Sequence, residues 1–300
     1  MKKFLLFILL SFYAASLFAQ TNHFKRTEDV IYGRKFGTAL TLDIFQPEKP
    51  NGCGIVFVVS GGWISAHEII LPQFYEPFIA RGYTVFAVVH GSQPKFQIPE
   101  IIQDMHRAIR FIRFNGKKYG IDPHRIGVTG GSAGGHLSLI LATQGGPGAS
   151  DAKDPIDRES SAVQCVACFF PPTDFLNYGK PGESAVGEGV LAPFKAAFGK
   201  VPKTAEAKQK FGKEISPIYS VTSNLPPTLI FHGDADKLVP IQQAESFVKR
   251  AEEAGASAKL IVKKGEGHGW KNWLSDFAEF VDWFDQHLRD AEPEKQPSSK

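Results

Sequence analysis

Short apolar runs alternate with longer segments of helical periodicity along most of the chain. The apolar runs predict strands over 30–32, 39–45, 54–60, 84–89, 125–129, 163–170, 228–232 and 258–263. Apolar residues recur at three- and four-residue steps from Ile101 to Ile112, and similar spacing predicts helices over 136–143, 240–254 and 274–288. This alternation predicts an α/β fold with a mostly parallel, eight-stranded sheet and helices on both faces.

Several segments depart from this alternation. The first two expected strands are joined by residues 33–37, which predicts an antiparallel hairpin at the edge of the sheet. The stretches 145–160 and 177–216 are rich in Gly, Pro and polar residues. We expect both as insertions above the carboxyl edge of the sheet, either as lids or as plain solvated loops. The end of the chain, 290–300, is expected to be disordered.

The first nineteen residues have the order of a secretory signal. Lys2 and Lys3 precede an apolar run over 4–10, and small residues end the segment at Ala19. The run is far shorter than the roughly 20 residues of a membrane-spanning helix. We therefore expect cleavage after Ala19 and export to the periplasm or the medium, without a stable membrane anchor.

Composition narrows the function classes. The chain has 300 residues, 43% hydrophobic and 22% charged, which fits one globular domain over 20–289. Its net charge of +3 falls to +1 without Lys2 and Lys3, which argues against nucleic acid as a partner. Cys165 and Cys168 are three positions apart on an expected strand and face opposite sides, so we expect buried free thiols.

The pentapeptide 130–134, Gly-Gly-Ser-Ala-Gly, lies between an expected strand and an expected helix. This context is typical of a nucleophilic serine on a sharp strand-to-helix elbow, where glycines remove Cβ atoms that would clash. Ser132 is thus the candidate nucleophile. The N–H of Ala133, at the start of the helix, is a candidate donor to the oxygen of a bound carbonyl.

A serine hydroxyl needs a base, and the base needs an orienting acid. Asp236 follows an expected strand within the segment 232–240 and is the expected acid, with Asp234 as the reserve. His268, flanked by glycines after the last strand, is the expected base. Oxyanion donors are expected from the loop after the third strand, at Gly61, Gly62 and Trp63.

With these motifs the chain resembles the α/β-hydrolase superfamily and, within it, small secreted esterases of the acetylxylan and feruloyl esterase type. The likeness covers about 29–288 and is carried by 40–43, 60–63, 81–83, 119–123, 130–135, 232–240 and 267–268. It implies the α/β-hydrolase fold, with Ser132 as nucleophile, His268 as general base and acid, and Asp236 as its partner. No cofactor is implied, because this triad moves only protons and an acyl group.

One departure from the family pattern concerns the oxyanion loop. Relatives usually carry His-Gly-Gly before the tryptophan, whereas this chain has Ser60 before its two glycines. Ser60 is expected to take over the hydrogen bonds of the absent histidine, and His90 could serve either the pocket or the structure. Trp63, His67 and Trp270 are expected to contact the substrate. The pair His67-Glu68 lacks the second histidine of a zinc helix, so no metal site is expected.

The expected function is that of a secreted serine carboxylesterase acting through an acyl-enzyme on short-chain or aromatic acyl esters of carbohydrate. The carbohydrate part of the expected substrate rests on analogy with the esterases that the chain resembles. One alternative is a serine peptidase, because prolyl-oligopeptidase-type domains share the arrangement at 232–239. A second is a non-catalytic binding protein on the same fold.

Overall fold

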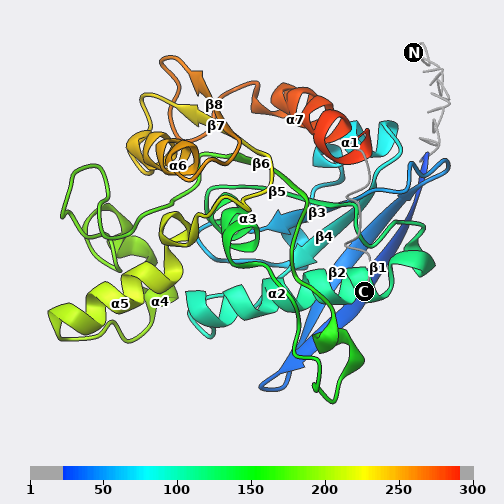
Figure 1. Ribbon diagram of the computed structural model, residues 1–300, viewed down its shortest axis with the longest axis horizontal. Helices are drawn as coiled ribbons and strands as arrows, with labels where there is room; N and C mark the ends of the chain where they lie inside the picture. Colours follow the sequence, from blue (N-terminus) through cyan, green and yellow to red (C-terminus); the bar gives the residue numbers. More distant parts are fainter. Residues whose placement is uncertain (1–22, 291–300) are drawn as a thin grey trace, which may run out of the picture.

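The computed structural model describes residues 23–290, and its strands form one eight-stranded sheet (Figure 1). The strand order is β1-β2-β4-β3-β5-β6-β7-β8. β1, β2 and β4 pair in antiparallel fashion and the other neighbours are parallel. The predicted mostly parallel, eight-stranded sheet is confirmed, as is the edge hairpin. The expected signal, 1–19, and all but the first residue of the expected tail, 290–300, lie outside the described residues.

Seven strands lie within two residues of the predicted apolar runs, whereas the edge strand β1 extends beyond the predicted 30–32 on both sides, through mostly polar residues that no apolar run marks. Their bounds are β1 (Phe24–Lys35), β2 (Thr38–Pro47), β3 (Gly54–Val59), β4 (Thr84–Val89), β5 (Ile126–Gly131), β6 (Cys165–Phe169), β7 (Thr228–Gly233) and β8 (Ala258–Lys263). β3, β6 and β7 are buried along their whole length, as expected for parallel strands covered on both faces.

Helices cover both faces of the sheet. Their bounds are α1 (Glu76–Ala80), α2 (Ile98–Phe114), α3 (Ala133–Gln144), α4 (Lys195–Phe198), α5 (Ala205–Ile215), α6 (Gln242–Glu253) and α7 (Phe277–Phe284). Apolar residues of α2, α3 and α6 pack into one core cluster, and those of α1 and α7 pack into the other. Within 23–290, no helix combines the length and the apolar character needed to cross a membrane.

Alternate residues of each strand enter different clusters. Cys165 belongs to the α1–α7 side and Cys168 to the α2–α3–α6 side, and both are free and fully buried. The prediction for these two thiols is therefore confirmed. Burial raises the pKa of Cys168 and that of Cys165, so neither carries a reactive thiolate at neutral pH.

The two segments that interrupt the regular alternation lie at opposite edges of the sheet. Residues 145–160 follow α3, which returns the chain to the amino edge because it runs antiparallel to β5. Arg113, in the last turn of α2 at this edge, donates to the Pro123 oxygen before β5 at 2.9 Å and to the Ala162 oxygen at 2.7 Å. Arg107, nearer the middle of α2, binds Asp154 at 2.6 Å and Asp157 at 2.7 Å. The prediction that 145–160 sits above the carboxyl edge is therefore wrong. Residues 177–216 form a short helix (Gly189–Phe194), α4 and α5, seen in yellow-green in Figure 1, beside the loop that follows β3.

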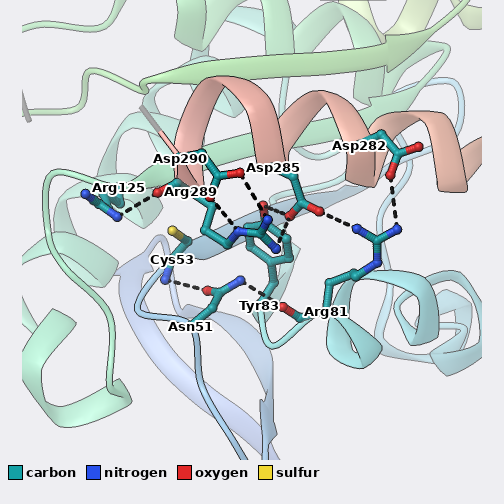
Figure 2. A network of polar contacts seen from close by, with 9 residues as sticks. All are labelled: Asn51, Cys53, Arg81, Tyr83, Arg125, Asp282, Asp285, Arg289 and Asp290. Carbon is teal, nitrogen blue, oxygen red and sulfur yellow. Dashed lines mark hydrogen bonds and ion pairs between the residues drawn. The ribbon is translucent and has the colours of Figure 1, made fainter. Parts of the chain in front are cut away.

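A polar network fastens the last helix to the amino edge of the sheet (Figure 2). Asp285 accepts a hydrogen bond from the Tyr83 hydroxyl at 2.8 Å and forms ion pairs with Arg81 and Arg289. The network also includes residues that directly precede β3, β4 and β5. Its members are Asn51, Cys53, Arg81, Tyr83, Arg125, Asp282, Asp285, Arg289 and Asp290.

Candidate active site

The candidate nucleophile lies on a strained elbow between β5 and α3. Ser132 has φ 54° and ψ −120°, a conformation that costs an ordinary residue about 1–3 kcal/mol. A Cβ on Gly130 would lie 2.7 Å from the backbone of Gly134, and one on Gly134 would lie 2.8 Å from the Val58 oxygen. The Ser132 N–H donates to the Phe169 oxygen at 3.0 Å. The glycines and this bond hold the serine at the carboxyl edge.

The three side chains grouped in the sequence analysis meet in one hydrogen-bonded chain. Ser132 Oγ lies 2.9 Å from His268 Nε2, and His268 Nδ1 lies 2.7 Å from Asp236 Oδ2. The carboxylate can only accept, so Nδ1–H donates to it and Nε2 is left to accept the serine proton. The imidazole is 22% exposed, whereas the carboxylate is fully covered. This geometry allows transfer of the serine proton to an imidazole that is held in one tautomer.

Several donors keep Asp236 ionised. Burial raises its pKa, but hydrogen bonds from His232, His268 and the Val239 N–H outweigh burial and hold the pKa well below its usual range. The N–H groups of Leu238 and Val239 both donate to Oδ1 at 2.9 Å. His232 Nε2 lies 2.7 Å from the Val239 oxygen and 3.5 Å from Asp236 Oδ2. The acid is therefore a carboxylate at neutral pH.

Asp234, the reserve candidate, has another task. Its side chain is exposed and accepts the Gly265 N–H at 2.6 Å. This bond connects the loop after β7 to the loop after β8. Asp234 thus helps to align the two loops that carry Asp236 and His268.

The loop after β3 supplies backbone donors beside the elbow, but fewer than expected. The Gly61 N–H donates to the Ile64 oxygen at 3.0 Å, so the prediction of Gly61 as an oxyanion donor is wrong for this conformation. Among residues 23–290, the N–H groups of Gly62, Trp63 and Ala133 have no acceptor. These three donors are available to a substrate oxygen.

Ser60 bonds to a buried histidine of the next loop, and its replacement of the family's usual histidine stays a prediction. Ser60 Oγ lies 2.8 Å from Nε2 of the buried His90, whose Nδ1 lies 2.7 Å from the Gly91 oxygen. Nδ1–H therefore donates to that carbonyl, and Nε2 accepts a hydrogen bond from the Ser60 hydroxyl. Burial lowers the pKa of His90 to about 4, so the ring is neutral. Both ring nitrogens are used, which gives His90 a structural role between the loops after β3 and β4.

The side chain of Trp63 does not face the substrate. It is only 2% exposed, and its Nε1–H donates to His136 Nδ1 at 3.2 Å. The ring packs against Phe194 and Phe198 of the 177–216 segment. The prediction that the Trp63 side chain contacts the substrate is wrong, because these contacts hold the ring in the core; the residue has a positive φ of 60°.

His67 lies away from the elbow, against the first two strands. Its Nδ1 is 3.5 Å from Asp29 Oδ1 and 3.8 Å from Asp43 Oδ1. β2 is separated from β5 by two strands of the sheet, so the prediction of His67 as a substrate contact is wrong. Glu28, Asp43 and His67 place potential metal ligands within 4.8 Å of one another. Arg26, however, pairs with both carboxylates and already supplies the positive charge there.

Trp270 is half-buried beside the candidate base. Its Nε1–H donates to Asp276 at 2.7 Å, and its ring packs on Phe170 with centroids 5.7 Å apart. Phe170 in turn contacts the His268 ring at 4.5 Å. A role of Trp270 in substrate binding stays a prediction. Sequence reasoning missed Phe170, although its place directly after β6, before two prolines, puts it at the carboxyl edge.

Comparison with known proteins places the chain in a family. The BD-FAE family model matches residues 42–251. Probable carboxylic ester hydrolase LipM of Mycobacterium tuberculosis is 29% identical over 225 residues, which are 73% of this chain and 50% of LipM. Esterase LipQ of the same organism is 30% identical over 256 residues, 81% of this chain and 56% of LipQ. The chain therefore spans about half the length of these curated relatives.

Solved structures agree with this placement. A truncated form of a carbohydrate esterase from gut microbiota superposes with a TM-score of 0.75 and 28% identity, over 89% of this chain and 99% of that one. The family model covers β3 to β7, the elbow and the loop of Asp236, whereas β1, β8 and His268 lie outside residues 42–251. The chain belongs to the BD-FAE family, and its fold is that of the α/β-hydrolase esterases.

Proposed function

We propose that this protein is a serine carboxylesterase that works through an acyl-enzyme. The observation that carries the proposal is the continuous chain from Ser132 through His268 to Asp236, with bonds of 2.9 and 2.7 Å. Names of relatives support it, because LipM and LipQ are both described as ester hydrolases.

In the first half-reaction, Ser132 Oγ attacks the ester carbonyl carbon while its proton passes to His268 Nε2. The negative charge on the former carbonyl oxygen is stabilised by backbone N–H groups of Ala133 and of the Gly62–Trp63 turn, each worth about 10² to 10³ in rate. His268 then gives its proton to the leaving alcohol, and Asp236 stabilises the imidazolium in between. Water, activated by the same imidazole, hydrolyses the acyl-enzyme.

The proposed substrates are short-chain or aromatic acyl esters of carbohydrate. The carbohydrate esterase that shares 28% identity with this chain supports the carbohydrate part. Phe170 and the half-buried Trp270 support the acyl part, because the Phe170 ring contacts His268 and the Trp270 ring packs on Phe170.

The first test is steady-state hydrolysis by wild type, Ser132→Ala and Ser150→Ala, the last an exposed serine on the 145–160 segment. We expect turnover of p-nitrophenyl acetate by wild type and Ser150→Ala, and none above background by Ser132→Ala. A panel of acetylated xylan, methyl ferulate and dipeptide amides then ranks the substrates. Amides cleaved faster than esters would favour the peptidase alternative. A wild type that neither turns over esters nor reacts with a fluorophosphonate would favour a binding protein.

We also propose export, supported by the signal-like order of residues 1–19. Expression of the full chain in a Gram-negative host should place esterase activity in the periplasmic extract, with Gln20 as the first residue by mass spectrometry. Activity that stays in the cytosol with an intact N-terminus would contradict this.

A further inference from the structure

Three successive carbonyls of the loop after β3 are held by hydrogen bonds. The Gly61 oxygen accepts from the Ile64 N–H at 3.0 Å. The Gly62 oxygen accepts from the side-chain amide of Gln93 at 2.6 Å, and the Trp63 oxygen accepts from the Gln93 N–H at 3.2 Å. Gln93 therefore binds two consecutive peptide groups of this loop, once through its side chain and once through its backbone.

These bonds fix the direction of the free donors. In a trans peptide the C=O and the following N–H point in opposite directions. The bond from Gln93 to the Gly62 oxygen therefore turns the Trp63 N–H to the other side of that peptide. The same reasoning applies to the Gly62 N–H, because Ile64 holds the Gly61 oxygen.

Rotation of the peptide between Gly62 and Trp63 would relieve backbone strain if the bond from Gln93 were lost. Trp63 has φ 60°, a region that is unfavourable for a residue with a large side chain. Rotation of this peptide by about 180° would bring φ of Trp63 to about −120°, in the broad allowed region. The same rotation would remove the N–H from the oxyanion site and place a carbonyl oxygen there. A carbonyl in that position would repel the developing negative charge.

We propose that Gln93 is a positioning residue, which keeps the Trp63 N–H directed at the reacting oxygen by holding the Gly62 carbonyl. This inference rests on the proposed esterase function. A donor on the Gly62 carbonyl also polarises the peptide and strengthens the Trp63 N–H as a donor. Gln93 touches no reacting atom; it acts through the peptide that does.

The test compares Gln93→Met with wild type. Methionine has a similar length but no N–H, so the packing is kept and only the bond to Gly62 is lost. Gln144→Ala is the matched control, because Gln144 also donates its side-chain amide to a backbone oxygen, that of Glu214 at 3.1 Å, far along α3. Kinetics on p-nitrophenyl acetate are combined with inhibition constants for a trifluoromethyl ketone, which forms a tetrahedral adduct with serine, and for acetate.

For Gln93→Met we expect kcat to fall about 10- to 100-fold, somewhat less than for loss of one whole oxyanion donor. KM and the affinity for acetate should stay within about twofold, while the affinity for the trifluoromethyl ketone falls in parallel with kcat/KM. Gln144→Ala should match wild type in all four quantities. A merely structural role would instead lower Tm or raise KM and leave the ratio of ketone to acetate affinity unchanged.

An unchanged kcat in Gln93→Met, or equal losses of ketone and acetate affinity, would overturn this proposal. The proposed function would stand in either case, provided that wild type turns over the ester and Ser132→Ala does not. Failure of wild type to hydrolyse esters would overturn both.

Discussion

Replacement of His136 by leucine is expected to destabilise the fold in a pH-dependent way. The ring is fully buried, accepts the Trp63 Nε1–H at 3.2 Å and donates to the Ile215 oxygen at 2.7 Å. It thereby connects the oxyanion loop, the elbow helix α3 and the end of α5. His136→Leu leaves a buried donor and a buried acceptor without partners, each costing about 1–3 kcal/mol. Near pH 7 we therefore expect a loss of about 2–6 kcal/mol.

The difference in unfolding free energy between wild type and His136→Leu should be smaller in acid. Burial lowers the pKa of His136 to about 4, despite its bond to Ile215. Between about 6.5 and about 4, the unfolded chain takes up a proton that the folded chain does not, so the stability of wild type falls as pH decreases. From about pH 7 to about pH 5 this costs wild type about 2 kcal/mol through His136. His136→Leu does not lose this stability, because leucine does not titrate. Other buried histidines, such as His90, act equally in both proteins and cancel.

Urea unfolding at the two pH values, followed by tryptophan fluorescence, measures both quantities. His124→Leu, at an exposed position on a turn, is the matched control and should stay within about 0.5 kcal/mol of wild type at each pH. A difference between His136→Leu and wild type that is the same at both pH values, or larger in acid, would refute a buried neutral imidazole.

Three further outcomes are expected. Asp236→Asn should lower kcat on p-nitrophenyl acetate about 10⁴-fold, because the imidazole loses the partner that fixes its tautomer; a loss under tenfold would contradict the triad. Gly134→Ala should lower the unfolding free energy by about 1–3 kcal/mol, because its Cβ would lie 2.8 Å from the Val58 oxygen, and an unchanged urea midpoint would argue against the tight elbow. Asp285→Ala should cost about 2–3 kcal/mol by leaving the Tyr83 hydroxyl unpaired, with kcat of the folded protein unchanged; a reduced kcat would show coupling to the active site.

Much of the fold and the triad could be predicted because local signals agree with the parallel-sheet topology. Strand, glycine-rich elbow and helix follow each other directly around Ser132. Asp236 and His268 each follow a strand, and the ends of neighbouring parallel strands meet at one edge of the sheet. No long-range contact has to be known for this reasoning.

The errors arise where a side chain's direction depends on distant contacts. Trp63 follows two glycines, which suits both an open pocket and a buried turn, and only the partner His136, 73 positions away, decides for the core. His67 is drawn to Asp43 of β2, again a contact that no local pattern reveals. Gln93 belongs to no motif, although it holds the loop beside the elbow. The position of 145–160, in contrast, could have been predicted from the order of elements alone. The segment follows a crossover helix, and such a helix returns the chain to the amino edge of the sheet.

The network around Asp285 has a consequence for how this protein can evolve. Asn51 and Arg125 precede strands of about 20 Å in length, whereas the reactive groups follow the opposite ends of such strands. Substitutions separated by that distance usually add without interacting. Selection can therefore change thermal stability at the amino edge of the sheet and substrate preference at its carboxyl edge as two nearly independent traits.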